Sequence, residues 1–293
     1  MQLTIKNADE VVGPNPPPLE QYGTRFLAEG DSWFTLGDLN PFKSSNLLFG
    51  LDFAQRNVAV NCGYPGKTLR RVVEQLQDLA YDGLLRGNVR RPWDAILLSA
   101  GGNDLIAAAQ VPPIDEGGQP VAKDSRLLLT PAEAAASGAA GGDPARYISD
   151  GGWKKLADYF RKSMEAFVAR RDSPQSQSQG RPIFVHTYAK PVVGLGGVVG
   201  APRGWLLPAF EAAGIAEEHR QQVSDRLFER LRDLIIEQAT GPTALPNLYV
   251  FDTSAVQDLA HDDWANEIHL KISGYRKLGR PFGAYIDKVM GAA

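Results

Sequence analysis

Four residues whose types could together serve one covalent reaction lie after apolar stretches of this sequence. They are Ser32 in "GDSW", Gly66 in "NCGYPGKT", Asn103 in "GGND" and His269 in "NEIHL". A serine hydroxyl is a weak nucleophile until a nearby base, most often histidine, takes its proton. The oxyanion that forms on attack needs N–H donors, which the backbone of Ser32 and Gly66 and the amide of Asn103 can supply. This combination is suited to acyl transfer.

Five apolar runs predict strands that would bring these residues together. They are "TRFLAEG" (24–30), "NVAVN" (57–61), "WDAILLSAGG" (93–102), "PIFVHTYA" (182–189) and "NLYVFD" (247–252). Helical spacing of apolar residues predicts helices over 68–85, 150–171, 217–240 and 272–290. Strands that alternate with helices indicate an α/β sandwich with a central parallel sheet. Ligands bind at the carboxyl ends of such strands, where the polar residues lie.

The rest of the chain suggests one domain with two insertions. Residues 1–22, proline-rich from residue 11, are expected to be an extended lead-in, and 23–293 to form the domain. Long segments at about 106–149 and 190–206 do not fit the alternation. The second is rich in glycine, which lowers the barrier to backbone rearrangement, so we expect a mobile cover over the site.

Composition excludes several other classes of protein. The net charge of −3 argues against a general nucleic-acid binder, which needs a basic face. The single cysteine, Cys62, can build neither a disulfide framework nor a cysteine-based zinc site. No stretch has the length of a membrane span, and the N-terminus lacks the features of a signal peptide. We therefore expect a cytoplasmic protein that uses no metal or cofactor.

The four motifs, in this order, resemble those of the SGNH, or GDSL-type, hydrolases. The resemblance runs from Gly30 to His269 and implies a flavodoxin-like three-layer α/β/α fold. It also implies Ser32 as nucleophile and His269 as base. Gly66, Asn103 and the Ser32 N–H would form the oxyanion hole, and a small-molecule ester would be hydrolysed through an acyl-enzyme without a metal.

One position departs from the family pattern. The family usually has Asp three residues before the histidine, and Asn266 stands there. An Asn oxygen can accept the Nδ1–H of the ring but adds no negative charge. If "DDWANEIHL" is a helical turn, Asn266 faces His269; if it is an open loop, Asp263 can fold back and supply the charge. We favour Asn266.

Each motif also has a plainer reading. Ser32 could be a helix N-cap, and "GGND" a simple strand-to-helix turn. "GKT" after a strand is the tail of a phosphate-binding loop, but the glycine that such a loop needs five residues earlier is Asn61. Of the other histidines, His186 ends a predicted strand on the functional edge and is a candidate for substrate contact.

Aromatic residues near the motifs are candidates for an apolar acyl pocket, with core packing as the alternative. Trp33, Tyr64 and Trp264 are the main candidates. The sequence thus predicts a serine ester hydrolase. The alternatives are a binding module that keeps the fold but hydrolyses poorly, and, with less support, a nucleotide-binding protein that uses the "GKT" turn.

Overall fold

The computed structural model describes residues 1–35, 45–73, 79–137, 143–198 and 200–291. In these residues six strands form one sheet in the order β1-β3-β2-β4-β5-β6, and every neighbouring pair is parallel. The strands are β1 (Thr4–Asn7), β2 (Arg25–Gly30), β3 (Val58–Asn61), β4 (Ala95–Ser99), β5 (Ile183–His186) and β6 (Leu248–Phe251). Each of the five predicted runs contains a strand, and the predicted parallel α/β architecture is confirmed.

The longest helices have the bounds that apolar spacing predicted. They are α7 (Asp150–Arg171), α9 (Glu217–Thr240) and α10 (Ile272–Met290). The shorter ones are α1 (Ala8–Val12), α2 (Leu47–Gly50), α3 (Leu69–Val73), α4 (Leu79–Leu85), α5 (Gly102–Ala109), α6 (Pro131–Ala136) and α8 (Leu206–Ala212). The predicted helix over 68–85 contains α3 and α4, and its middle, 74–78, lies outside the described residues.

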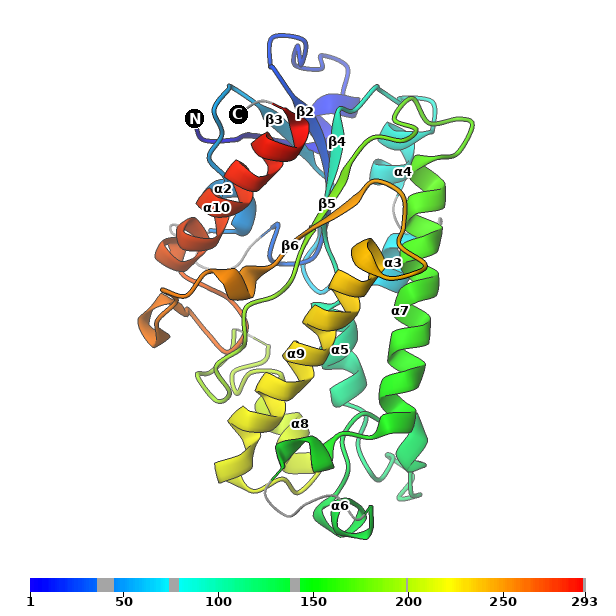
Figure 1. Cartoon of the computed structure of the whole chain (residues 1–293), viewed down its shortest axis with the longest axis vertical. Coiled ribbons are helices and arrows are strands. Elements are labelled where there is room, and N and C mark those ends of the chain that lie inside the picture. Colours follow the sequence, from blue (N-terminus) through cyan, green and yellow to red (C-terminus); the bar gives the residue numbers. More distant parts are fainter. Residues whose placement is uncertain (36–44, 74–78, 138–142, 199, 292–293) are drawn as a thin grey trace.

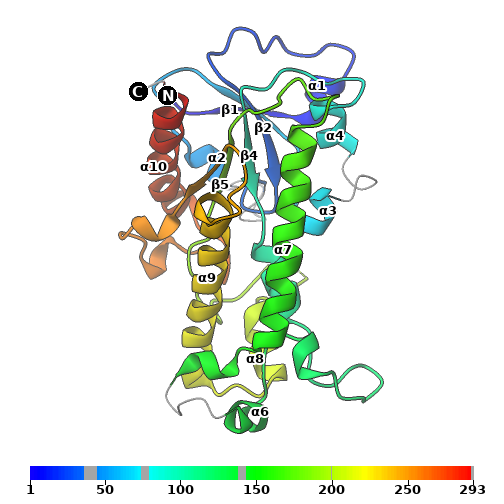
Figure 2. The ribbon, with the colours of Figure 1, turned by 45° about the vertical axis from the view of Figure 1, so that its right-hand side comes forward.

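The helices cover both faces of the sheet (Figures 1 and 2). α2 and α10 pack together on one face, while α3, α4 and α7 cover the other. Strands β2 to β6 follow the flavodoxin-like order, in which the chain crosses from one side of its first strand to the other. The switch point therefore lies between β2 and β4, the two strands that lead into Ser32 and Asn103.

The prediction of an extended lead-in over 1–22 is wrong for its first half. Residues 4–7 form β1, which pairs with β3, and residues 8–12 form α1. The capping box between Asn7 and Glu10 marks the start of α1. The proline-rich stretch that follows α1 led to this prediction, and residues 13–18 do lack helix and strand.

Two of the long helices, α7 and α9, extend past the carboxyl edge of the sheet. In Figures 1 and 2 they run well below the strands, and α6 and α8 lie near their lower ends, while Figure 1 shows α5 beside α9. The segment predicted as an insertion, 106–149, begins in α5 and contains α6. Helices thus lie beyond the carboxyl edge of the sheet.

Two glycines allow α10 to lie directly against α2. A Cβ on Gly50 would come within 2.2 Å of the carbonyl oxygen of Tyr275, and a Cβ on Gly279 within 2.2 Å of the Gly50 carbonyl carbon. Both distances are far below van der Waals contact, so the helices meet backbone to backbone. Because α10 begins three residues after His269, this packing fixes where the His269 loop ends.

Gly279→Ala is therefore expected to lower the free energy of unfolding by about 1–3 kcal/mol, as overpacking does. Gly83→Ala is the matched control, since its Cβ would meet only Val89 at 3.5 Å in helix α4. The control should be neutral or slightly stabilising. Urea denaturation of both variants measures the difference, and equal midpoints would contradict the close packing.

Candidate active site

Ser32 and His269 meet at the carboxyl edge of the sheet. Ser32 lies on the turn that follows β2, and His269 lies in the loop before α10. The Oγ of Ser32 is 2.7 Å from Nε2 of His269, a hydrogen-bond distance for O–H to nitrogen. Both side chains are nearly buried, with 7% and 5% exposure. A serine hydroxyl that donates to a histidine in this way has a base in place to accept its proton.

Asn266 holds the opposite side of the His269 ring. Its Oδ1 is 3.1 Å from Nδ1 and also accepts the backbone N–H groups of Ile268, at 3.2 Å, and His269, at 3.0 Å. Two backbone donors fix the amide with its oxygen toward the ring, so Nδ1 must carry a proton. Nε2 is then the unprotonated nitrogen that faces Ser32.

The loop that presents Asn266 is not a helical turn. The N–H groups of Ala265 and Asn266 both bond back to the carbonyl of His269, at 2.9 and 3.3 Å. This tight reversal brings Asn266 to the ring. Asp263, the alternative partner, instead accepts from Lys277 Nζ at 2.8 Å and from the Ala260 N–H at 2.9 Å. The structure does not bring Asp263 to the His269 ring.

Glu267, to which no sequence pattern assigned a role, anchors the glycine-rich segment 190–206. This carboxylate is fully buried and accepts four backbone N–H groups, from Gly194, Trp205, Leu206 and Leu207. Its own backbone bonds to Val192 and Gly196. The segment is thus fastened to the loop that carries His269, and it cannot move as one mobile cover without breaking these bonds.

Gly66 occupies a turn for which glycine is well suited. The Lys67 N–H bonds to the Tyr64 carbonyl at 3.2 Å, with Pro65 and Gly66 between them. Gly66 has φ of +74°, so the Pro-Gly pair has the pattern of a type II turn. Asn103 donates from Nδ2 to the Lys67 carbonyl at 3.0 Å, which leaves the second hydrogen of that amide for a ligand.

Buried side chains fasten this turn to β2, the strand that precedes Ser32. Lys67 is only 7% exposed, and its Nζ lies 2.6 Å from Oε1 of Glu29, which is completely buried in β2. Asp104 accepts the Leu69 N–H at the start of α3 and the hydroxyl of Tyr159. Lys67 and Asp104 therefore hold the Gly66 turn in place from two directions.

The four predicted substrate contacts lie in different surroundings. Trp33 is buried beside Ser32, Trp264 is buried further along the same edge, and Tyr64 is 66% exposed next to the Gly66 turn. His186 has no exposed surface, and its ring nitrogens contact the Thr187 carbonyl and Ser99 Oγ, both at 2.9 Å. The prediction that His186 contacts substrate is wrong, because its side chain ends below the surface of the site.

Two cavities share part of their walls near Ser32, and Ser32 itself lines the smaller one. The one at Ser32 and Asn103 has a volume of about 10 Å³, enough for about one water molecule. A larger one of about 320 Å³ shares Tyr188, Ala189 and Phe228 with it.

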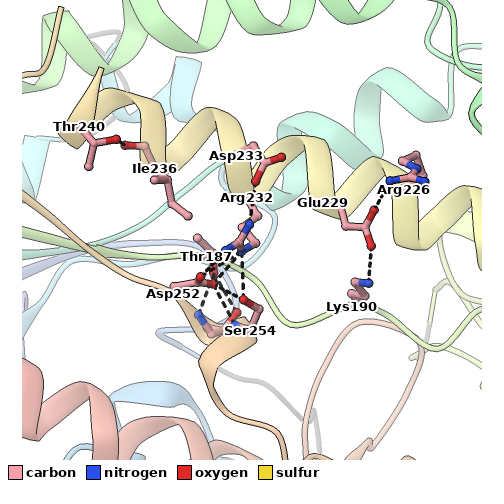
Figure 3. Close-up of polar contacts among 11 residues, drawn as sticks. Thr187, Lys190, Arg226, Glu229, Arg232, Asp233, Ile236, Thr240, Asp252 and Ser254 are labelled. Carbon is pink, nitrogen blue, oxygen red and sulfur yellow. Dashed lines mark hydrogen bonds and ion pairs between the residues drawn. The ribbon is translucent and has the colours of Figure 1, made fainter. Parts of the chain in front are cut away.

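Ion pairs fix the wall of the larger cavity. Figure 3 shows Arg232 of α9 bound to Asp252 after β6, at 2.5 Å, and Lys190 bound to Glu229 of α9, at 2.6 Å. These pairs hold α9 against the loops that follow β5 and β6.

Burial lowers the pKa of the His269 imidazole from 6.5 to about 4. Burial disfavours the cation, and the neutral amide of Asn266 does not offset it. His269 is therefore neutral above pH 4 and able to accept the Ser32 proton, and protonation below that pH removes this ability.

No family model and no curated protein matches this chain. Solved structures do resemble its fold. An extracellular lipase from Streptomyces rimosus aligns with TM-score 0.50 and 14% identity, over 90% of this chain and 99% of the lipase. A lipase from a goat rumen metagenome aligns with TM-score 0.44 and 12% identity, over 92% of this chain and 97% of that one. At these identities the likeness concerns the fold alone.

Two features are absent from the part of the chain that the structure describes. No helix there is long and apolar enough to cross a membrane. Those residues also contain no group of three or more His, Cys, Asp or Glu side chains that could hold a metal ion.

We expect a histidine titration, followed by NMR, to give a midpoint near pH 4 for His269. Asn266→Asp should raise this midpoint, because a carboxylate beside Nδ1–H favours the imidazolium. Asp263→Asn is the control and should leave it nearly unchanged, since Asp263 bonds to Lys277. A wild-type midpoint near 6.5, or a larger shift in the control than in Asn266→Asp, would contradict the geometry.

Proposed function

We propose that this protein is a serine ester hydrolase in which Ser32 is the nucleophile and His269 the general base. The observation that carries the proposal is the 2.7 Å contact from Ser32 Oγ to a His269 ring whose other nitrogen is held by Asn266. Nucleophile, base and orienting group are the three parts of a hydrolytic triad. The resemblance of the four motifs to SGNH hydrolases supports the same assignment.

The reaction would proceed in two balanced halves. Ser32 Oγ attacks the ester carbonyl while its proton passes to Nε2 of His269, and the oxyanion accepts hydrogen bonds from the N–H groups of Ser32 and Gly66 and the amide of Asn103. His269 then protonates the leaving alcohol, which leaves an acyl group on Ser32. Water attacks this acyl-enzyme, gives its proton to His269, and the acid departs as Ser32 regains a proton.

The neutral Asn266 changes the electrostatics of this scheme and not the tautomer. In serine proteases, Asp→Asn at the third triad position lowers kcat by about 10⁴, because the wrong tautomer results. Here the backbone N–H groups of Ile268 and His269 turn the amide oxygen to the ring, so the required tautomer is kept. The imidazolium that forms during reaction lacks only the stabilising negative charge.

The two alternatives have less support. A weakly catalytic binding module is consistent with the missing charge at Asn266, and it would bind ligands without turnover. A phosphate-binding role for "GKT" needs a lysine that reaches phosphates, whereas the Lys67 ammonium is buried against Glu29. The geometry favours hydrolysis over both.

Ser32→Ala should lower hydrolysis of p-nitrophenyl acetate by several orders of magnitude without loss of folding. A fluorophosphonate should label the wild type on the peptide that contains Ser32 and should not label this variant. Ser137→Ala, at the far end of the molecule, is the control and should behave as wild type. Label on another serine, or turnover by Ser32→Ala, would refute the assignment.

Asn103→Ala should lower kcat roughly 10²–10³-fold with little change in KM, as loss of one oxyanion donor does. The reason is that its free amide hydrogen would meet charge that develops only in the transition state. Steady-state kinetics with the same ester measure both constants. If only KM changes, Asn103 binds the substrate and is not an oxyanion donor.

A further inference from the structure

A second group of polar side chains lies beneath Ser32, and the proposed hydrolysis does not use it. Its members are Asp31, directly before the nucleophile, Ser99 at the end of β4, His186 at the end of β5, and Tyr188. Their exposures are only 2%, 1%, 0% and 6%. Because buried polar groups almost always make hydrogen bonds, the contacts reveal where the protons of this group are.

The contacts form one continuous chain. Tyr188 Oη lies 2.5 Å from Oδ2 of Asp31, and Asp31 Oδ1 lies 2.8 Å from Ser99 Oγ. Ser99 Oγ is in turn 2.9 Å from Nε2 of His186, and Nδ1 of His186 is 2.9 Å from the Thr187 carbonyl oxygen. Every link has hydrogen-bond length, so every link needs one proton.

An ionised Asp31 next to a neutral His186 cannot supply these protons. The Thr187 carbonyl only accepts, so Nδ1 carries the single proton of the neutral ring and Nε2 is an acceptor. A carboxylate only accepts as well. Ser99 has one hydroxyl proton for two acceptor neighbours, so one of its two links would bring lone pairs together without a hydrogen. The chain therefore holds one more proton.

That proton resides either on Asp31 or on His186. On Asp31 it gives two neutral groups: the acid donates to Ser99, and Ser99 donates to His186. On His186 it gives a carboxylate and an imidazolium, two full charges without solvent, which is costly. We propose that Asp31 is an uncharged carboxylic acid in the folded protein at pH 5, and that the relay from Asp31 through Ser99 to His186 retains its proton.

The surroundings favour the neutral form. Burial raises the pKa of Asp31 to about 6 and lowers the pKa of His186 to about 4. The nearby carboxylate of Asp104 on α5 also raises the pKa of Asp31. The groups that face His186 are the rings of Trp33, Phe34, Tyr188 and, from α10, Phe282.

The relay keeps negative charge away from the nucleophile. Asp31 is adjacent to Ser32 in sequence, and like charges repel strongly where water is excluded. An uncharged Asp31 allows the substrate oxyanion of the proposed reaction to form near Ser32 without a carboxylate charge beside it. Its Oδ1 also accepts the Trp33 N–H at 3.0 Å, which shapes the turn that carries Ser32. Asp31 is therefore a positioning residue.

Infrared spectroscopy at pH 5 tests the proposal without reference to activity. At this pH an ordinary Asp side chain, with pKa 3.8, is mostly ionised, whereas Asp31 should give the carbonyl band of a protonated carboxylic acid. Asp31→Asn, close in shape to the acid, should remove that band and so assigns it. If the wild type and Asp31→Asn give the same carboxylic-acid signal, Asp31 is ionised and the proposal is wrong.

His186→Phe separates the relay from burial alone. Phenylalanine cannot accept from Ser99, so the serine proton becomes available to Asp31, which no longer needs its own. The relay predicts that the Asp31 pKa falls below 5 and that the acid band disappears at pH 5. If burial alone retained the proton, the more apolar variant would keep the band, and that outcome overturns the relay.

NMR of the wild type applies if His186→Phe does not fold. The ¹⁵N shifts of His186 should show a neutral ring at pH 5, protonated on Nδ1 and unprotonated on Nε2. An imidazolium at that pH would place the proton on His186 and would refute the uncharged Asp31. These measurements do not depend on whether Ser32 hydrolyses esters, so failure of the proposed function would leave the proton count intact.

Discussion

The hydrogen bond between Ser32 and His269 is the contact on which the rest of the site depends. It joins two loops that are 237 residues apart in sequence. A misplacement of about 1 Å between reacting groups can cost about 10² in rate, so both loops must be held firmly. The Trp33 indole N–H donates to the Ile268 carbonyl at 3.1 Å, directly linking the nucleophile turn to the histidine loop. Glu267 fastens the same loop to 190–206 from the other side.

Buried carboxylates do most of this positioning. Glu29 binds Lys67 below the Gly66 turn. Asp104 accepts the backbone N–H of the first residue of α3, and Glu267 accepts the backbone N–H of the first residue of α8. Asp104 and Glu267 satisfy backbone N–H groups at helix starts, which have no acceptor within the helix, whereas Glu29 pairs with an ammonium group. Asp31 differs, because it must both accept and donate, and a carboxyl can donate only when it is protonated. The same kind of side chain thus acts as an acceptor at these three positions and as both donor and acceptor beneath Ser32.

The sequence was sufficient to predict the sheet, the three long helices and the edge at which the polar residues meet. Those features depend on hydrophobic periodicity, which is local and strong. β1 was missed because it is short and precedes a proline-rich stretch. Glu267 was missed because its partners, Gly194 and residues 205–207, lie about 60 to 73 positions away, and no local pattern reports such a contact. Asn266 was identified by spacing, but the loop that presents it is a tight reversal and not the helical turn that suggested it.

His186 and His269 show most clearly what a sequence alone does not contain. His186 is the last residue of β5, and His269 lies in a loop at the carboxyl edge of the sheet. The Nδ1 proton of His186 is fixed by the Thr187 carbonyl, and that of His269 by Asn266 Oδ1. The difference lies at Nε2. In His269 this nitrogen faces a serine that borders a cavity, whereas in His186 it faces Ser99, which is buried and bonded to Asp31. The first arrangement can pass a proton to and from a substrate, and the second can only retain one. Which histidine can serve as the proposed base is therefore decided by the third group in each chain, and that group is set by tertiary packing.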